Sequence, residues 1–144
     1  MISIREMGIS DYDTVMALWH QSEGLLMREV DSREHIARYL ERNPGLSFVA
    51  LHQKRIVGAV LVGTDGRRGY LQHLAVSPDH RHQGIGSQLV SESIRALKAI
   101  GILKTHLFVI NDNKSVQSFY ENLGWFPRDE VRMYSYNSSD EHNA

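Results

Sequence analysis

The segment Arg81-His82-Gln83-Gly84-Ile85-Gly86 combines residues that can hold an anion. It follows the apolar stretch Leu74-Ala75-Val76 and Ser77-Pro78, and it opens a run with helical periodicity. The first turn of a helix leaves about four backbone N–H groups without partners, and the helix dipole adds positive potential there. Glycine lets a phosphate approach the backbone, and Arg81 adds a fixed positive charge. The spacing predicts a strand, a phosphate-binding turn and a helix, suited to a pyrophosphate.

The two glycines are also compatible with other kinds of site. An isolated Gly-x-Gly also occurs where a helix start only packs closely against its neighbours. The dinucleotide-binding fingerprint needs a third glycine three residues after Gly86, where this chain has Leu89. The phosphate-binding loop of ATPases needs Gly-Lys-Ser/Thr, which the sequence lacks.

A second segment, Asn113 to Trp125, contains an asparagine, a helical pattern that ends in Phe119-Tyr120, and Leu123-Gly124-Trp125. The two segments together resemble the two signatures of the GNAT N-acetyltransferases. The first is Arg/Gln-x-x-Gly-x-Gly/Ala, and the second is an asparagine, a helix ending in an aromatic residue and tyrosine, and Leu-Gly-aromatic. The order of the elements extends the resemblance over residues 2–136, with the specific motifs in 70–126.

The resemblance implies acetyl-coenzyme A as cosubstrate. The histidines show no metal-ligand spacing, so no metal ion is expected. By analogy with the family, the backbone of β-strand residues Leu74, Ala75 and Val76 holds the pantetheine arm. The pyrophosphate is expected on the backbone of Arg81, His82, Gln83, Gly84, Ile85 and Gly86. The family also implies that Asn113 and Ser115 contact the arm of the cofactor.

Acetyl transfer to an amine needs a neutral amine, a polarised thioester oxygen and a stabilised leaving thiolate. Tyr120 matches the tyrosine of the family that acts as general acid on the thiol side. A phenol of pKa about 10 is a weak proton donor to a thiolate whose thiol has pKa about 8.5, so a strengthening hydrogen bond describes the role better. The alternative is that Tyr120 belongs only to the apolar stripe from Val116 to Leu123. The resemblance also implies a backbone N–H near Leu74 or Ala75 for the thioester oxygen.

The general base has two candidates. His73 lies on the strand that should line the cleft, and an unperturbed imidazole suits this role at pH 7. Strict alternation puts Tyr70 and Gln72 on the opposite face of the strand from His73. Glu29 lies in the irregular segment 20–31, where it is either a base or a solvated loop acid. Its acidic neighbours Glu23 and Asp31 would suit a cationic acceptor, although Asp31 also has the position of a helix cap.

Composition excludes several classes of protein. The chain has 144 residues, of which 42% are hydrophobic and 23% are charged, as in an ordinary globular domain. It has no cysteine, which excludes a disulfide scaffold, a thiol nucleophile and a thiolate zinc site. The net charge of -1 offers no basic field to nucleic acid or to a membrane surface. No apolar run is long enough for a membrane span and no signal peptide is visible, so we expect a cytoplasmic protein.

Hydrophobic periodicity predicts the order β-α-α-β-β-β-α-β-α-β, which is an α/β (α+β) fold with a mixed sheet flanked by helices, as in the GNAT family. Helices are expected from Ser10, from the capping box Asp31/Glu34, over 85–100 and from Asn113. Strands are expected at 2–5, 47–51, 56–62, 70–76, 104–110 and 131–136, with a four-residue turn at 52–55. The prediction is one domain over 1–137 and a polar, disordered tail over 138–144.

The function expected from these observations is acetyl transfer from acetyl-coenzyme A to a primary amine by direct attack in a ternary complex. A small-molecule acceptor is preferred. A protein N-terminus or lysine is the alternative, and a non-catalytic acyl-coenzyme A binder is a further one. The amphipathic segment 131–136 also suggests a homodimer formed through an edge strand.

Overall fold

The computed structural model describes residues 1–22 and 25–144. It divides into two compact units, Met1–Phe108 and Val109–Ala144, which are described separately. The predicted single domain over 1–137 stays a prediction. No helix of the described residues is long and apolar enough to cross a membrane.

The first unit is built on a five-stranded mixed sheet in the order β1-β2-β3-β4-β5. All neighbouring strands are antiparallel except β4 and β5, which are parallel. The strands are β1 (Ile2–Glu6), β2 (Phe48–His52), β3 (Arg55–Thr64), β4 (Gly69–Val76) and β5 (Thr105–His106). This arrangement confirms the predicted fold class.

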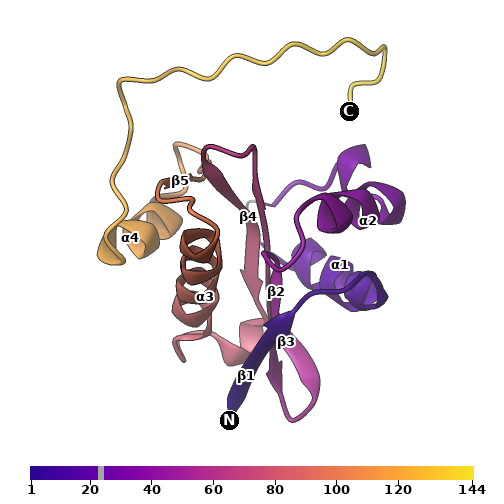
Figure 1. Ribbon diagram of the computed structural model, residues 1–144, viewed down its shortest axis with the longest axis vertical. Coiled ribbons are helices and arrows are strands. Elements are labelled where there is room, and N and C mark those ends of the chain that lie inside the picture. The colour runs from indigo at the N-terminus through magenta and orange to yellow at the C-terminus, as the bar shows by residue number, and fades with distance from the viewer. Residues whose placement is uncertain (23–24) are drawn as a thin grey trace. The chain divides into compact units, whose positions relative to one another are not determined.

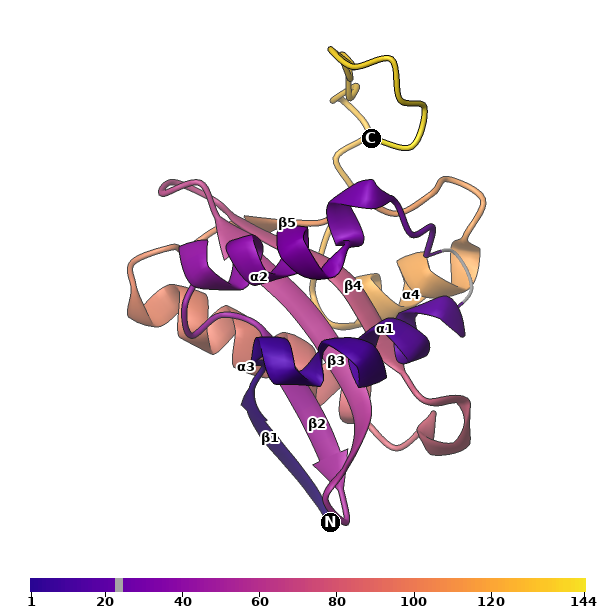
Figure 2. The same cartoon turned by 90° about the vertical axis from the view of Figure 1, so that its right-hand side faces the viewer.

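Helices cover both faces of this sheet (Figures 1 and 2). The helices α1 (Tyr12–His20) and α2 (Arg33–Arg42) lie on one face, and α3 (Ile85–Ala99) lies on the other. Short 3₁₀ turns precede each of them: η1 (Ile9–Asp11), η2 (Glu29–Asp31) and η3 (Pro78–His80). We call the side of the sheet covered by α1 and α2 the α1/α2 face.

The core on the α1/α2 face joins the helices to the middle of the sheet. Trp19 of α1 and Ile36 of α2 are buried against Val49, Leu61 and Ala75 of the strands. On the other face, α3 packs on β2, β3 and β4 with Leu89 and Leu97 fully buried. A methyl group added at Gly58 of β3 would lie 3.0 Å from a Leu89 Cδ atom. The close approach of α3 to the sheet therefore favours glycine at this position, since a larger residue would force Leu89 to shift.

Several element boundaries differ from the sequence predictions. The hairpin between β2 and β3 turns on two residues, not four, and these are Gln53 and Lys54 with φ of +52° and +68°. Positive φ at both central positions is typical of the two-residue turn that matches strand twist. The predicted strand 104–110 is reduced to Thr105–His106.

The predicted strand at 131–136 was wrong. The second unit contains the helix α4 (Lys114–Asn122), and residues 131–136 have no regular secondary structure. Val131, Met133, Tyr134 and Tyr136 are all exposed. An alternating pattern describes one face of a strand, but a strand also needs a partner for its N–H and C=O groups. The structure shows no such partner for this segment among the described residues.

Candidate active site

The turn before α3 has the geometry of an anion-binding helix start. Gly84 is the N-cap residue of α3 and has φ of +80°, a left-handed conformation that favours glycine. The first hydrogen bond of the helix runs from the Gln88 N–H to the Gly84 carbonyl over 3.0 Å. The N–H groups before Gln88 in the first turn therefore have no carbonyl partner within the helix. A Cβ atom at Gly84 would meet nothing within 4 Å. The space beside this backbone is therefore open to a ligand.

The other residues of the turn hold this backbone in place. Arg81 donates from Nε to the carbonyl of Val76 at 3.3 Å, which ties the turn to the end of β4. Ile85 is 1% exposed, so its side chain anchors the first helical turn in the core. His82 and Gln83 are exposed. The Arg81–Gly86 segment thus presents backbone to solvent while its apolar side chain faces inward.

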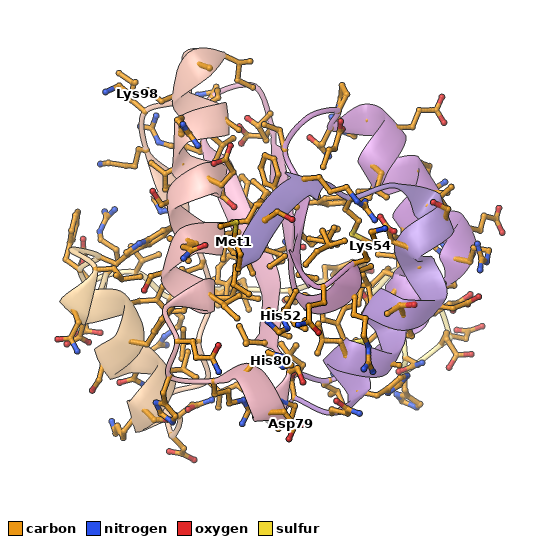
Figure 3. All side chains as sticks on the ribbon, turned by 90° about the horizontal axis from the view of Figure 1, so that it is seen from below. Met1, His52, Lys54, Asp79, His80 and Lys98 are labelled. Atoms are coloured by element: carbon orange, nitrogen blue, oxygen red, sulfur yellow. The ribbon has the colours of Figure 1, made fainter. Side chains whose placement is uncertain are left out.

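His80 lies beside His52 rather than in this turn (Figure 3). The two ring centroids are 5.3 Å apart, one from η3 and one from the end of β2. Nδ1 of His80 is buried and has no hydrogen-bond partner among the residues that the structure describes. The contact with His52 indicates a packing role for the His80 ring.

One edge of β4 is open over most of its length. The strand pairs with β5 only through Gly69 with Thr105 and Tyr70 with His106. Beyond Tyr70, β4 continues to Val76 with no strand on that side among the described residues. The segment Leu74-Ala75-Val76 lies in this unpaired part. An extended ligand could therefore pair with this backbone in the way that an added strand does.

A bulge interrupts β4 within the part that does not pair with β5. Ala59 lies opposite Ala75 and Leu61 lies opposite Gln72, so two residues of β4, His73 and Leu74, oppose one residue of β3. His73 has φ of +51°. A bulge of this kind breaks the alternation of side chains and increases the local twist. The increased twist gives a reason for the separation of β4 from β5.

The bulge overturns the prediction that Gln72 and His73 face opposite sides. Gln72 lines a pocket together with Tyr39 of α2. His73 contacts Trp19 of α1 through an edge-to-face ring contact at 4.9 Å. Both side chains therefore lie on the α1/α2 face. Strict alternation would have put His73 on the opposite face, and the extra residue of the bulge places it on the same face as Gln72.

His73 forms a hydrogen-bonded pair with a buried carboxylate. Nε2 of His73 lies 2.8 Å from Oδ1 of Asp31, and the two side chains are 20% and 7% exposed. Oδ2 of Asp31 accepts a hydrogen bond from the backbone N–H of Arg28 at 3.0 Å. Burial alone would raise the pKa of the Asp31 carboxyl, but the hydrogen bonds from His73 and Arg28 outweigh it and hold this pKa below its ordinary value. Asp31 is therefore an anion that can only accept hydrogen bonds.

Asp31 was expected to cap α2 or to remain a solvated loop acid, and the structure assigns the cap to its neighbour. Ser32 is the N-cap residue of α2, and its Oγ accepts a hydrogen bond from the His35 N–H at 3.4 Å. Asp31 ends η2 instead, which turns its carboxylate toward β4. Glu29 begins η2 and is exposed. Of the acidic residues singled out from the sequence, Glu23 lies outside the described residues.

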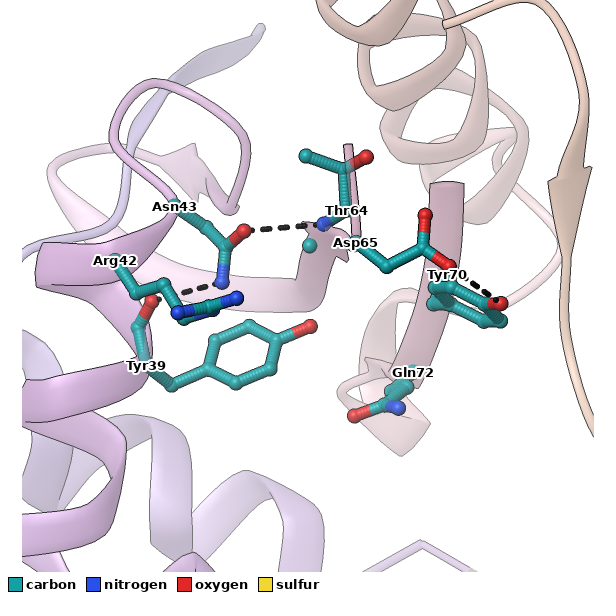
Figure 4. A pocket seen from close by; sticks show the side chains of 8 residues that line it. Tyr39, Arg42, Asn43, Thr64, Asp65, Tyr70 and Gln72 are labelled. Atoms are coloured by element: carbon teal, nitrogen blue, oxygen red, sulfur yellow. Dashed lines mark hydrogen bonds between the residues drawn. The ribbon is translucent and has the colours of Figure 1, made fainter. Parts of the chain in front are cut away.

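A pocket of about 250 Å³ lies on the same face of the sheet (Figure 4). The C-terminal end of α2 supplies Tyr39 and Arg42, and the end of the β3–β4 hairpin supplies Asp65 and Tyr70. Gln72, next to His73 in the chain, also lines it. Burial raises the pKa of Tyr39 to about 12, so its hydroxyl stays protonated. Sequence reasoning did not anticipate this pocket, because its walls meet only through the packing of α2 on β3.

In the second unit, the two residues expected near the cofactor arm lie at the start of α4. Oδ1 of Asn113 accepts from the Val116 N–H at 3.3 Å, which caps the helix. Ser115 donates from its hydroxyl to the same oxygen at 3.3 Å. Asn113 therefore has the helix-capping role predicted from the sequence.

Tyr120 lies in the last turn of α4 between two other aromatic rings. The ring centroids of Phe119 and Trp125 are 5.0 Å and 5.5 Å from that of Tyr120, both in edge-to-face contact. Tyr120 is 8% exposed. Burial raises the pKa of its phenol well above the ordinary value. Full proton transfer from this hydroxyl is therefore less favourable than the sequence alone suggested, and a donated hydrogen bond remains.

These features agree with a comparison of the whole sequence with known families. The model of the acetyltransferase (GNAT) family matches residues 13–125. The chain belongs to the GNAT acetyltransferase family. Both the family and the fold expected from the two motifs are thereby confirmed.

Individual relatives support this membership over most of the GNAT chain. It is 36% identical over 132 residues to an acetyltransferase of Sodalis glossinidius, which covers 92% of each chain. It is 38% identical over 122 residues to an acetyltransferase of Pectobacterium atrosepticum, which covers 85% of this chain and 86% of the other. The crystal structure of PaiA N-acetyltransferase from Thermoplasma acidophilum, in complex with coenzyme A, has the same fold. Its TM-score is 0.79 at 23% identity, with 90% of this chain and 92% of that one covered.

Within this GNAT chain, the structure brings some of the predicted site residues together and adds one. The first unit joins the open edge at Leu74–Val76, the turn Arg81–Gly86 and His73. It brings Asp31, not Glu29, to His73. The signal for Asp31 in the sequence was ambiguous because the Asp-Ser pair offers two helix caps. Among the described residues, no cluster of three or more His, Cys, Asp or Glu side chains could hold a metal ion.

Proposed function

We propose that this GNAT acetyltransferase transfers an acetyl group from acetyl-coenzyme A to a primary amine, with His73 as the general base. The observation that carries the proposal is the opening beside β4. The strand separates from β5 after Tyr70, and its unpaired part leads to the glycine turn at the start of α3. An extended pantetheine arm and a pyrophosphate are joined in this order in coenzyme A.

The residues present fit this cosubstrate. The backbone of Leu74, Ala75 and Val76 would pair with the amides of the pantetheine arm, as an added strand does. The backbone N–H groups between Arg81 and Gly86 would hold the pyrophosphate, with the open space at Gly84 admitting it. By analogy with the family, Asn113 and Ser115 would contact the arm. When bound, acetyl-coenzyme A supplies an acetyl group activated as a thioester.

His73 is preferred to Glu29 as the base for two reasons. Its ring is held by contacts with Asp31 and Trp19, whereas Glu29 is exposed. It also lies at the bulge of β4, the strand that would hold the pantetheine arm. Nδ1 of His73 accepts one proton from the ammonium form of the acceptor, directly or through one water, and the neutral amine attacks the acetyl carbon. The carbon–sulfur bond breaks, and the second proton of the amine passes to the sulfur.

Tyr120 is proposed to stabilise the leaving sulfur. Because burial raises the pKa of its phenol, Tyr120 keeps its proton and donates a hydrogen bond that strengthens as negative charge develops on the sulfur. This role depends on the family resemblance of the segment Asn113–Trp125.

The pocket beside Gln72 supports a small-molecule acceptor. Its volume of about 250 Å³ is small for a ligand site, and its walls offer hydroxyl, amide and charged groups. A primary amine carried on a compact polar body would place the body between Tyr39 and Tyr70 and the amine toward His73. A protein N-terminus or lysine is the alternative acceptor, and an assay with both kinds of amine distinguishes the two.

The experiment measures release of coenzyme A thiol with a panel of small polar amines and of peptides with free N-termini or lysines. His73→Asn should lower kcat at neutral pH by about 10²-fold or more with the best acceptor, since general base catalysis contributes this much. Asparagine is chosen because it tolerates the positive φ of this position. Glu29→Gln is the matched control and should change kcat little. A large loss in Glu29→Gln and none in His73→Asn would reverse the assignment.

A second variant tests the acceptor site. A Cβ atom at Gly63 would lie 2.5 Å from the Tyr39 hydroxyl oxygen, so Gly63→Ala must displace that ring within the pocket. It should raise KM for a small acceptor while the affinity for acetyl-coenzyme A stays the same. Gly8→Ala is the control, because the added methyl group would meet only the Ser10 hydroxyl at 3.8 Å. Turnover of peptides alone, unaffected by Gly63→Ala, would favour the peptide alternative. No turnover of any amine, together with tight acetyl-coenzyme A binding, would favour a non-catalytic binder.

A further inference from the structure

We propose that Asp31 is a positioning residue that fixes the His73 imidazole with its proton on Nε2 and its free lone pair on Nδ1. This inference rests on the proposed role of His73 as base. It concerns a residue that touches neither the acceptor nor the cosubstrate in the proposed function and acts only through His73.

The contacts of Asp31 prevent its carboxylate from turning away. Oδ2 is held by the Arg28 N–H at 3.0 Å, and the backbone carbonyl of Asp31 accepts a hydrogen bond from the Tyr12 hydroxyl at 2.7 Å. Both the side chain and the backbone of Asp31 are thus tied, one to η2 itself and one to α1. Only Oδ1 remains for His73, at 2.8 Å.

This geometry selects one tautomer of the imidazole. An ionised carboxylate has no proton to donate, so the short contact requires a proton on Nε2 of His73. In the neutral ring, the other nitrogen then carries the lone pair that can accept a proton. Among the described residues, Nδ1 of His73 has no hydrogen-bond partner, and the side chain is 20% exposed. The nitrogen left free by Asp31 is the one that can receive the proton of an amine.

The ring is also fixed in orientation. Trp19, which is fully buried, contacts the His73 ring edge to face at 4.9 Å. The backbone at His73 has φ of +51°, an uncommon value for a residue with a side chain. A residue held in such a conformation persists where its surroundings determine it, and here the surroundings are the carboxylate on one side and the indole on the other.

The charged groups around the pair come from two elements. From α1, the Tyr12 hydroxyl binds the Asp31 carbonyl, and Asp13 pairs with Arg33 at 3.0 Å. The guanidinium of Arg33, at the start of α2, lies 5.0 Å from the centre of the Tyr12 ring. The carboxylate of Asp31 is the one charged group in direct contact with the imidazole among the described residues. Its removal should therefore dominate any change in the titration of the pair.

The chain contains a matched control for the Asp31→Asn variant. Asp11 ends η1 as Asp31 ends η2, and it is also buried. Its Oδ2 accepts from the Gly8 N–H at 2.9 Å, three residues before it, and it pairs with Arg5 at 2.8 Å. Asp11→Asn therefore removes the same charge from the same kind of turn without touching His73.

The experiment begins with the unliganded protein and requires no activity. Two-dimensional NMR of ¹⁵N-labelled histidine rings at neutral pH should show His73 as a single Nε2–H tautomer in the wild type, assigned by its loss in His73→Asn. Asp31→Asn should give a mixture of tautomers or the Nδ1–H form, and Asp11→Asn should leave the wild-type pattern. An Nδ1–H ring in the wild type, or an unchanged pattern in Asp31→Asn, would overturn the proposal. An Nδ1–H ring in the wild type would refute the proposal even where the Asp31→Asn variant fails to fold.

Kinetics then separate this proposal from the proposed function. Asp31→Asn should lower kcat by about 10- to 10²-fold with little change in KM for acetyl-coenzyme A. The acidic limb of its pH profile should move to lower pH, because an amide no longer stabilises the imidazolium. A kcat loss in Asp31→Asn equal to that in Asp11→Asn, with no shift of the limb, contradicts a positioning role. If His73→Asn keeps full activity while Asp31→Asn shows the expected change of tautomer, His73 is not the base. The role of Asp31 in fixing the ring would then still hold.

Discussion

Substitution of Gly84 by aspartate tests the cofactor site with the least disturbance to the fold. The new Cβ atom would meet nothing within 4 Å, so no packing is lost inside the protein. The cost is conformational, because φ of +80° disfavours a side chain by about 1 kcal/mol. The new carboxylate would lie at the start of α3, where the proposal puts the pyrophosphate. Gly84→Asp should therefore fold and fail to bind acetyl-coenzyme A.

The size of the expected effect follows from the length of the chain. At about 2.1 cal/mol/K per residue, 144 residues give an unfolding entropy of about 0.3 kcal/mol/K. A ligand at 100 times its Kd stabilises the folded state by about 2.7 kcal/mol, which raises Tm by about 9 °C. The backbone cost at Gly84 lowers the Tm of the unliganded variant by only about 3 °C on the same scale. The two effects are therefore distinguishable in one thermal denaturation experiment.

The control is a glycine at the other end of the same helix. Gly101 follows α3, has φ of +87°, and would also present its Cβ atom to open space. Gly101→Asp carries the same backbone cost and the same added charge, so it should keep the full ligand-induced rise in Tm. An equal rise in Gly84→Asp and the wild type would refute the anion site at the start of α3. Loss of the rise in both variants would show that added charge, and not the position of Gly84, prevents binding.

Three other predictions concern catalysis, acid stability and assembly. Tyr120→Phe keeps the ring between its aromatic neighbours and removes only the hydroxyl. The kcat should therefore fall about 10²-fold, with unchanged affinity for acetyl-coenzyme A. An unchanged rate of the chemical step in single-turnover kinetics would show that Tyr120 is a core residue only. The native pKa values of Asp11 and Asp31 are lowered, so their contribution to stability is complete above the unfolded value of about 3.9 and is lost as pH falls through the native values. Urea denaturation at about pH 2 to 5 should therefore show a weaker pH dependence in either Asn variant, and an unchanged dependence would refute the linkage. Light scattering at micromolar concentration should give about twice 16.5 kDa, since the exposed segment 131–136 still offers apolar area to a second copy, and a mass of 16.5 kDa would refute the homodimer.

Local signals in the sequence predicted the elements whose boundaries depend on single residues. The helix expected over 85–100 is observed as Ile85–Ala99, between Gly84 and Gly101, both with positive φ. Asn113 caps α4 as expected. These features follow from the conformational freedom of glycine and the short reach of a capping side chain. They could be predicted because their causes lie within a few residues of them.

Features that depend on distant partners could not be predicted in this way. The strand expected over 104–110 contains only Thr105 and His106, since its length depends on where β4 turns away. The carboxylate of Asp31 reaches a histidine 42 residues later in the chain, and no local pattern links the two. The Tyr39–Tyr70 pocket likewise needs the packing of α2 against the β3–β4 hairpin. The family resemblance predicted the cofactor site. It did not predict the general base, because members of the family have their bases at different positions.

The bulge in β4 connects these observations. With strict alternation along the strand, Gln72 would lie on the α1/α2 face and His73 on the opposite face, where α3 packs. His73 would then contact neither Asp31 nor Trp19. The extra residue at His73–Leu74 returns the imidazole to the α1/α2 face, the same face on which Gln72 lines the pocket. The same kind of bulge increases strand twist, and here it lies in the part of β4 that has separated from β5. One inserted residue can therefore account both for the backbone edge proposed to hold the acetyl donor and for the side chain proposed to deprotonate the acceptor.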